Sequence, residues 1–458
     1  MRFDSFLNMF KYYADNGDGV ALVYDDGDGK KEIRFSGLID AVNARKAELA
    51  AAGKTSIGIF CSGKKDCIIT IFAAVAAKMQ VVMLDESLSD KVLAAQIQKA
   101  DIDMLWADDE ETVKDFEQYM NGGVEKDAGR ILFFTSGTTS AAKAVVLTEQ
   151  SLCASAYNGS QKLPLTADDT LLCVLPLSHV FGFVCSLLWG LSCGAKVALG
   201  RGTRQLMVDF DYFKPTAVSL VPMLLGFLLK NELLNAELNL ILVGAGDCPD
   251  SLLEAVAAMG KRVCFGYGLT ETSSGVAISV SGDVHAMEIC PDDEIKIADD
   301  GEILIKAPTC MMQGYYKDDE STAAALKDGW LYSGDLGSFD SDGKLYITGR
   351  KKEILVLPTG TKIFLPEYEG AIAKALGNSE LAVILLRGKP VLIIRESEDM
   401  SEELLTKVAS VMRELPQSQR LSQVIFKQDP LPRTPTGKIK RWELQKTEEE
   451  KYGNNNEV

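Results

Sequence analysis

Histidine is rare in this sequence, with two residues, His179 and His285, among 458. A histidine-rich metal site is therefore excluded, and any metal should be a hard ion held by carboxylates and phosphates. The ten cysteines are scattered and include no Cys-x-x-Cys pair. Scattered thiols are typical of a reducing compartment rather than of a disulfide scaffold, so we expect a cytoplasmic protein.

Long hydrophobic runs are also missing. The most apolar windows, residues 180–191 and 219–229, are shorter than the roughly 18 residues that a membrane-spanning helix needs. Residues 1–10 carry charges and lack the apolar run of a signal peptide. Positive charge is in deficit, and the formal net charge of −17 argues against non-specific binding to nucleic acid or to anionic membranes.

The order of strand and helix patterns predicts an α/β fold. Short apolar runs alternate with amphipathic segments up to about residue 265, which predicts mostly parallel sheets covered by helices. From about residue 283, short strands and Asp-Gly turns predict a small β-barrel-like part. We expect a large N-terminal domain at residues 1–350, a small α+β C-terminal domain at 351–447 and a charged, disordered tail at 448–458.

The first segment with chemical meaning is residues 131–143, an apolar strand that runs into hydroxyl residues, a glycine and Lys143. Backbone N–H groups and small hydroxyls at a strand end suit a phosphate chain. The Walker P-loop pattern does not fit, because Ala142 rather than glycine precedes the lysine. A Ser/Thr-rich surface turn is the competing interpretation.

Two further segments suit a nucleotide. In residues 265–272, a strand ends in two glycines around Tyr267, and Thr270 and Glu271 follow. The aromatic ring could stack on a base, and the carboxylate could hold Mg²⁺. In residues 329–353, Asp335 suits the two hydroxyls of a ribose and Arg350 suits the same sugar or a phosphate. The alternatives are a glycine-rich turn and a solvated basic turn.

A fourth segment, residues 432–441, is a proline-stiffened basic loop that presents Lys438. Alone, such a loop is more often a surface patch. Together, in order and spacing over about residues 20–445, the four segments resemble the adenylate-forming superfamily of acyl-CoA synthetases, luciferases and peptide-synthetase adenylation domains. Residues 330–335 and 349–357 look most like fatty-acyl-CoA ligases, and residues 175–182 resemble the acyl-pocket segment of the family.

The resemblance implies a role for each matching residue. The β- and γ-phosphates of ATP would lie against Thr135, Ser136, Gly137, Thr138, Thr139 and Lys143. Adenine and the acid would meet Gly244, Ala245, Gly246, Tyr267 and Gly268. Thr270 would touch the α-phosphate, Glu271 with Thr138 would hold Mg²⁺, and Asp335 with Arg350 would bind the ribose.

The resemblance also implies a mobile C-terminal lid. Lys438 would bridge the substrate carboxylate and the α-phosphate, Lys352 would lie at the hinge, and Gly360 would line the pantetheine channel. His179 is either a satisfied core residue or a gate beside the acyl carbonyl, and we assign no role to His285. Two glycines and a proline that are usual in the phosphate loop are missing at residues 140–144.

The predicted function is therefore that of an ATP-dependent, AMP-forming acyl-CoA ligase. We expect a medium- or long-chain fatty acid as the substrate, Mg²⁺ as the metal and CoA, or the phosphopantetheine of an acyl carrier protein, as the acceptor. Alternatives are an acyl-carrier-protein ligase, an aromatic-acid–CoA ligase and, from another class, a catalytically silent nucleotide-binding regulatory protein. The oligomeric state is left open by the sequence.

Overall fold

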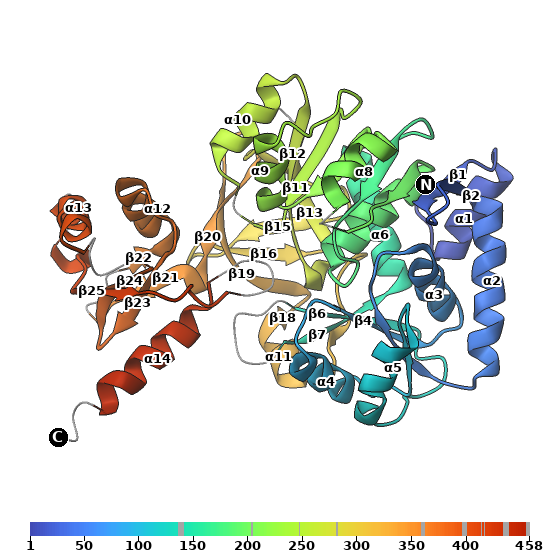
Figure 1. Cartoon of the computed structure of the whole chain (residues 1–458), viewed down its shortest axis with the longest axis horizontal. Coiled ribbons are helices and arrows are strands. Elements are labelled where there is room, and N and C mark those ends of the chain that lie inside the picture. Colours follow the sequence, from blue (N-terminus) through green and yellow to red (C-terminus); the bar gives the residue numbers. More distant parts are fainter. Residues whose placement is uncertain are drawn as a thin grey trace.

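The computed structural model describes residues 1–135, 142–202, 205–246, 248–280, 283–358, 362–395, 401–413, 415, 417–433 and 439–454. Figure 1 shows two bodies of unequal size, with the N-terminus in the larger one and the C-terminus in the smaller one. No helix in the described ranges is both long and apolar enough to cross a membrane.

The first sheet of the large body is the one that carries the phosphate-loop segment. Its strand order is β17-β7-β6-β4-β3-β5 among the described residues, parallel from β5 to β6 and antiparallel at β7 and β17. The strands are β3 (Ser56–Phe60), β4 (Gln80–Leu84), β5 (Met104–Trp106), β6 (Arg130–Phe134), β7 (Ala144–Thr148) and β17 (Gly314–Tyr315).

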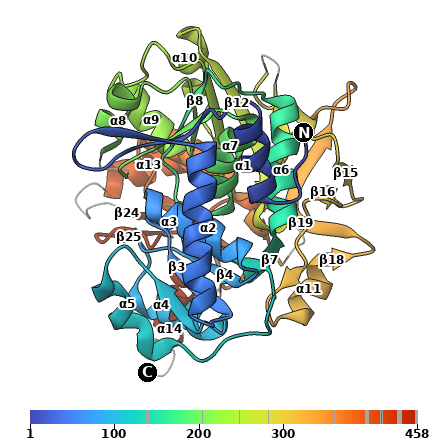
Figure 2. The same ribbon diagram turned by 90° about the vertical axis from the view of Figure 1, so that its right-hand side faces the viewer.

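Alternation along β4 explains why this sheet is covered on both faces. Val81 and Met83 pack into one apolar cluster, while Val82 and Leu84 pack into another, because successive side chains of a strand point to opposite faces. The covering helices are α1 (Phe6–Asp15), α2 (Phe35–Ala51), α3 (Lys65–Ala76), α4 (Asp90–Lys99) and α5 (Glu110–Phe116). Figure 2 looks onto the side of the molecule where the covering helices lie, with α2 running lengthwise in front.

The second sheet is larger, with 14 strands among the described residues, and it is parallel in its middle and antiparallel at both ends. The parallel strands are β8 (Thr170–Cys173), β9 (Lys196–Leu199), β10 (Ala217–Leu220), β11 (Leu240–Gly244) and β12 (Arg262–Leu269), with β1 (Val20–Asp25) joining them and β2 (Lys30–Arg34) at the edge. This order confirms the α/β class predicted from the alternating pattern.

The short strands predicted as a barrel-like part extend this same sheet. They are β13 (Ser274–Ser279), β14 (Met287–Ile289), β15 (Glu294–Ile297), β16 (Glu302–Lys306), β18 (Leu326–Lys327), β19 (Trp330–Phe339) and β20 (Leu345–Arg350), with α11 (Asp319–Ala325) before β18. Their antiparallel pairing continues from β12, so the nucleotide segments at Tyr267 and Asp335 belong to one sheet.

A helical layer lies between the two sheets. Leu187 and Leu188 pack in the same cluster as Ile131 of the first sheet, and Trp189 packs in the cluster that holds Leu242 of the second. This layer contains α6 (Glu149–Lys162), the π-helix η2 (Gly182–Leu188) and α7 (Trp189–Cys193). The outer face of the second sheet is covered by α8 (Leu206–Phe213), α9 (Pro222–Lys230) and α10 (Asp250–Ala258).

The small body has its own apolar clusters, composed of residues 355–444. Its strands are β21 (Ile354–Val356), β22 (Lys362–Phe364), β23 (Leu381–Leu386), β24 (Lys389–Arg395) and β25 (Gln423–Lys427). Its helices are α12 (Leu365–Leu376), α13 (Ser401–Arg413) and α14 (Arg441–Asn454).

The C-terminal tail differs from the expectation of disorder from residue 448 onward. Helix α14 continues through residue 454, and residues 455–458 lie outside the described part of the chain. The physical reason is Glu448, a buried carboxylate that forms ion pairs with Lys427 at 2.7 Å and Lys451 at 3.2 Å. These contacts fasten a segment whose composition alone indicates a solvated tail.

Candidate active site

The phosphate-loop segment joins β6 to β7, and these two strands pair antiparallel. The Thr135 N–H donates to the Lys143 carbonyl at 2.9 Å, and the Lys143 N–H donates to Thr135 Oγ1 at 3.2 Å. These bonds fix the two described ends of the loop. Ser136, Gly137, Thr138 and Thr139 lie outside the described residues, so their predicted phosphate and metal roles stay predictions.

Glu271, the predicted metal ligand, lies in the 3₁₀ turn η4 (Thr270–Thr272) that follows β12. The turn is held by Thr272, whose Oγ1 accepts the Leu269 N–H at 3.1 Å and bonds to the Ser274 carbonyl at 2.9 Å. A half-buried carboxylate is the hard oxygen ligand that Mg²⁺ prefers. The described residues contain no cluster of three or more acidic, histidine or cysteine side chains suited to a metal.

Tyr315 connects these two segments, and no sequence motif pointed to this residue. Its hydroxyl donates to Glu271 Oε1 at 2.7 Å, and the Lys143 ammonium lies 4.5 Å from the centre of its ring. Strand β17 carries Tyr315 beside Val145 of β7. No local pattern predicts this pairing, because the two strands are far apart in the chain.

The nucleoside residues form a second connected group. Tyr267 donates its hydroxyl to Asp335 Oδ2 at 2.9 Å, and Arg350 Nε lies 2.8 Å from Asp335 Oδ1. Burial, and then the Asp335 charge, raise the pKa of Tyr267 well above its usual value near 10, so its hydroxyl remains a donor. The predicted stacking on adenine and binding of ribose therefore concern residues that already touch each other.

The strand-end glycines lie next to this group. Gly244 ends β11 and pairs with Gly266 of β12, and Gly268 follows two residues later. A Cβ on Gly244 would lie 2.9 Å from the Phe181 ring, so only glycine permits this contact. Ala245 adopts a left-handed backbone with φ of 64°, and Gly246 completes the bend. Ligands of α/β sheets bind at such carboxyl ends.

His179 has a partner that sequence reasoning missed. Its Nε2 lies 3.2 Å from Asp85 Oδ2, at the carboxyl end of β4. Burial on its own raises the pKa of Asp85, but hydrogen bonds from His179 and Ser87 outweigh it and lower that pKa to about 2. An ionised carboxylate only accepts hydrogen bonds, so His179 Nε2 carries the proton. His285 instead contacts exposed Asp250 at 2.6 Å, outside this group.

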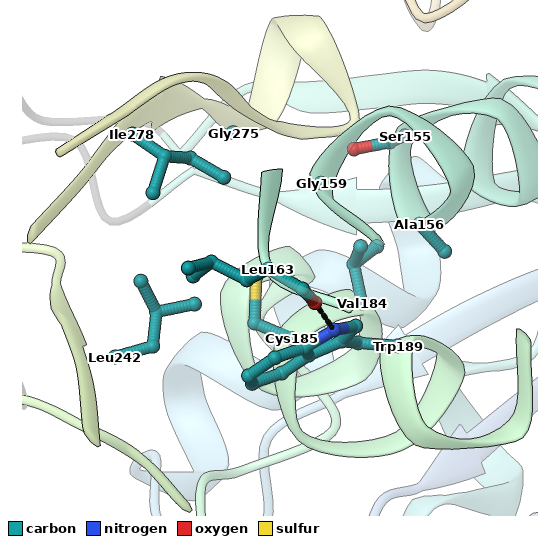
Figure 3. Close-up of a pocket in the computed structure, with 10 residues that line it drawn as sticks. All are labelled: Ser155, Ala156, Gly159, Leu163, Val184, Cys185, Trp189, Leu242, Gly275 and Ile278. Atoms are coloured by element: carbon teal, nitrogen blue, oxygen red, sulfur yellow. Dashed lines mark hydrogen bonds between the residues drawn. The ribbon is translucent and has the colours of Figure 1, made fainter. Parts of the chain in front are cut away.

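Beyond His179 the chain enters η2, which lines an apolar cavity of about 30 Å³ (Figure 3). A Cβ on Gly182 would lie 2.2 Å from the Pro176 carbonyl oxygen, so the tight entry into η2 requires glycine. Trp189 lies against the cavity, and its Nε1 donates to the Leu163 carbonyl at 2.8 Å. The cavity is lined by Ser155, Ala156, Gly159, Leu163, Val184, Cys185, Trp189, Leu242, Gly275 and Ile278.

The lid residues are only partly described. Lys352 lies in the 3₁₀ turn η5 (Lys351–Glu353), directly after β20 and before the small body. Gly360 and Lys438 lie outside the described residues. The chain on either side of the lysine loop is joined by a bridge between Arg433 and Ile439 and by the Lys440 N–H, which donates to the Pro432 carbonyl at 2.8 Å.

Comparisons with known protein sequences agree with this geometry. The family described as "AMP-binding enzyme" matches residues 111–316. A 2-succinylbenzoate–CoA ligase of Bacillus cytotoxicus is 29% identical over 81% of this chain and 84% of its own length. The enzyme of the same name from Listeria monocytogenes is 27% identical over 93% of this chain and 96% of its own length. An indoleacetate–CoA ligase of Aromatoleum aromaticum is 30% identical over 56% of this chain and 54% of its own length.

Solved structures show the same fold. An o-succinylbenzoate–CoA synthetase from Bacillus subtilis, in complex with its acyl-adenylate, matches with a TM-score of 0.83 at 24% identity, over 96% of this chain and 98% of that chain. The family match and the acid–CoA ligases among the relatives support membership of this chain in the adenylate-forming superfamily of AMP-binding enzymes. Within that superfamily it is an AMP-forming acid–thiol ligase.

Proposed function

We propose that this ligase activates a compact, largely apolar carboxylic acid of the aromatic class and transfers its acyl group to CoA. The observation that carries the proposal is the cavity of about 30 Å³ beside η2, which is bounded by Trp189. A space of this size holds about one water-sized group. Within the described residues it has room for the end of a compact acid rather than for a long tail. The names of the relatives, which refer to succinylbenzoate and indoleacetate, support the same class.

A medium- or long-chain fatty acid, which the sequence favoured, is the competing substrate class. Its tail would have to displace Trp189 from the hydrogen bond to Leu163, and the relatives' names give fatty acids no support. Nor do they support a carrier protein as the acceptor. A catalytically silent regulator is disfavoured because the candidate metal and ribose groups are both held in place, Glu271 by Tyr315 and Asp335 by Arg350.

The ligase uses ATP with Mg²⁺, and its acceptor is the CoA thiol. Glu271 fits the metal, because Mg²⁺ is usually held by one or two carboxylates together with substrate phosphates. We propose that Thr138 assists it, that Thr270 contacts the α-phosphate and that Thr135 and Lys143 hold the outer phosphates together with the loop between them. Asp335 and Arg350 would bind the ribose. When bound, Mg²⁺ would offset phosphate charge at Glu271.

The chemistry has two halves. In the first, an oxygen of the substrate carboxylate attacks the α-phosphorus and pyrophosphate leaves, which needs charge stabilisation more than covalent help. In the second, the CoA sulfur attacks the acyl carbonyl and AMP leaves. The mixed anhydride is easily hydrolysed, so the buried helical layer around η2 must exclude water.

The free state of all ten cysteines agrees with the proposed cytoplasmic location.

We propose that residues 351–447 act as the lid that alternates between the two halves. Lys438 would enter for adenylation, Lys352 would allow rotation, and the Gly360 loop would line the thiol channel. Lys438→Ala should abolish adenylation while it spares thioester formation from supplied acyl-AMP. Equal loss of both half-reactions would show that the lysine is structural.

The experiment that tests the substrate class is ATP–pyrophosphate exchange with a panel of acids. The panel contains 2-succinylbenzoate, indoleacetate, benzoate, octanoate and palmitate, and thioester formation is then measured with CoA and with a phosphopantetheinylated carrier protein. We expect exchange with one or more of the aromatic acids and thioester formation with CoA. Exchange with palmitate and with none of the aromatic acids would overturn the proposal.

A further inference from the structure

Two contacts hold the backbone of Tyr315, apart from those of its side chain. It pairs with Val145 in the β17–β7 ladder, and its N–H donates to Thr322 Oγ1 at 2.8 Å. The Thr322 hydroxyl in turn bonds to the Asp318 carbonyl at 2.8 Å in the first turn of α11. The residue is 8% exposed. Its ring is therefore held rigidly between the phosphate-loop hairpin and the turn that carries Glu271.

The two polar contacts of Tyr315 join two residues of the candidate ATP site. The hydroxyl donates to Glu271 Oε1 at 2.7 Å, and the ring face takes the Lys143 ammonium at 4.5 Å. Among the described residues, no other side chain hydrogen-bonds to the Glu271 carboxylate. Burial, and then the Glu271 charge, raise the pKa of Tyr315 well above its usual value near 10, so the hydroxyl remains a donor.

We propose that Tyr315 is a positioning residue for the metal–nucleotide complex. Its hydroxyl orients the Glu271 carboxylate, which would hold Mg²⁺, and its ring holds the Lys143 ammonium beside the start of β7. The inference rests on the proposed ATP and Mg²⁺ roles of Glu271 and Lys143. A donor that orients a metal-binding carboxylate is commonly worth about tenfold or more in metal affinity.

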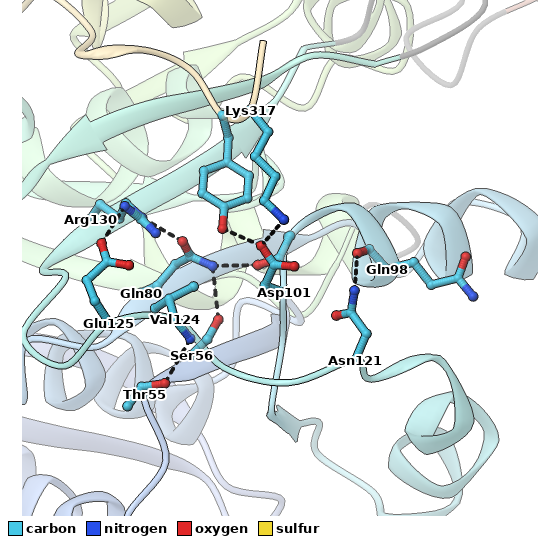
Figure 4. A network of polar contacts seen from close by, with 12 residues as sticks. Thr55, Ser56, Gln80, Gln98, Asp101, Asn121, Val124, Glu125, Arg130 and Lys317 are labelled. Carbon is cyan, nitrogen blue, oxygen red and sulfur yellow. Dashed lines mark hydrogen bonds and ion pairs between the residues drawn. The ribbon is translucent and has the colours of Figure 1, made fainter. Parts of the chain in front are cut away.

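The adjacent residue, Tyr316, offers a matched control. It is also 8% exposed, its hydroxyl donates to Asp101 Oδ2 at 2.6 Å, and the Arg130 guanidinium lies 5.0 Å from its ring centre. These partners belong to a polar network around Gln80 and Asp101 (Figure 4), and Glu271 is not one of them. The two tyrosines thus share burial, a carboxylate acceptor and a cation over the ring, but only Tyr315 contacts the candidate ATP site.

The test compares Tyr315→Phe, Tyr315→Leu and Tyr316→Phe with the unmodified enzyme. Calorimetry measures binding of a non-hydrolysable ATP analogue with Mg²⁺ and with EDTA, and pyrophosphate exchange measures KM for MgATP and for the acid. Tyr315→Phe should weaken Mg²⁺-dependent analogue binding and raise KM for MgATP about tenfold, with metal-free binding and KM for the acid unchanged. Tyr315→Leu should weaken metal-free binding as well, because the cation–π contact with Lys143 is lost.

Tyr316→Phe should leave every binding and kinetic value unchanged. Wild-type MgATP affinity in Tyr315→Phe, or equal effects in the two Phe variants, would overturn the inference. As a second measurement, Glu271→Gln with Tyr315→Phe should bind MgATP no more weakly than Glu271→Gln alone, and additive losses would contradict action through Glu271. Absence of exchange in the unmodified enzyme with every acid would instead count against the proposed function, on which the calorimetry does not depend.

Discussion

Asp335 and Arg350 face each other across the β19–β20 ladder, and Arg350 Nε lies 2.8 Å from Asp335 Oδ1. The Asp335 carboxylate is 2% exposed, so its charge needs partners in the folded protein, and Arg350 and Tyr267 provide them. Arg350, one member of the pair, directly precedes the turn that contains Lys351 and Lys352. The proposed ribose site and the proposed hinge are therefore covalent neighbours.

Asp335→Asn should weaken ATP use. A charged hydrogen bond is worth roughly 1.5–3 kcal/mol, so KM for ATP should rise roughly 10- to 100-fold in pyrophosphate exchange. The control is Asp300→Asn, which removes an exposed carboxylate 2.6 Å from Lys351. Exposed pairs contribute little, so this variant should keep the KM for ATP. Equal KM values in the two variants would contradict the ribose assignment.

Trp189→Leu should extend the cavity beside η2. Loss of the indole removes the wall and its hydrogen bond to Leu163, so octanoate should gain kcat/KM by about tenfold or more, because each buried methylene contributes about 0.8 kcal/mol. The assay is exchange with the acid panel. Trp330→Leu is the matched control. Trp330 is the first residue of β19, its ring lies against the Lys296 ammonium, and it does not line the cavity. An unchanged acid profile in Trp189→Leu would show that Trp189 does not limit chain length.

His179→Ala should raise KM for the acid about tenfold, as expected for loss of one oriented polar group beside the substrate. Asp85→Asn should have a smaller effect, because its amide oxygen can still accept from His179 Nε2.

The pKa of Asp85 is lowered to about 2, so its stabilising effect is present above about pH 4 and is lost as the pH falls through 2. Kinetics from pH 5 to 9 should therefore show no break from Asp85. If Asp85→Asn impaired the enzyme more than His179→Ala, the carboxylate would have a role beyond orienting the ring.

Asp293 should make the protein less stable as the pH rises. It is 8% exposed, neither of its carboxylate oxygens has a hydrogen-bond partner among the described residues, and burial followed by the Asp292 charge raises its pKa from 3.8 to about 7. A raised pKa favours folding below pH 3.8, and this contribution is lost as the pH rises through 7; the shift corresponds to at most about 4 kcal/mol.

Asp293→Asn should therefore gain melting temperature relative to the unmodified protein as the pH rises from 5 to 8. Scanning calorimetry at several pH values measures the difference. Asp292→Asn, which removes an exposed partner of Arg2, is the control and should change this pH dependence much less. A constant difference between Asp293→Asn and the unmodified protein at all pH values would show that Asp293 does not titrate in this range.

Lys352→Pro should stiffen the turn between β20 and the small body, because proline fixes φ. Adenylation should stay largely intact while thiol transfer stalls, measured as separate half-reactions. Lys352→Ala leaves the backbone free and serves as the control. Normal thiol transfer in Lys352→Pro would rule out a hinge at this residue.

Much of the fold followed from local patterns. The parallel strands β3, β4 and β6 and the helices between them follow the alternation that the sequence predicted up to about residue 265, because hydrophobic periodicity is encoded locally. The helical structure of the C-terminal tail was not predictable from local patterns, because Glu448 of α14 pairs with Lys427, which lies in a different element. The proposed substrate class also rests on a contact that local patterns do not encode, the hydrogen bond by which Trp189 is held to the Leu163 carbonyl beside the cavity.

The sequence by itself determined the class of chemistry, because the candidate nucleotide-binding groups lie in short local segments, such as the one in which Glu271 follows β12. Only the tertiary structure decided which groups touch. Tyr315 reaches Glu271 across 44 residues, and Asp85 reaches His179 across the ends of different elements. Such contacts arise from strand pairing and helix packing between distant segments, and side-chain periodicity carries no information about them.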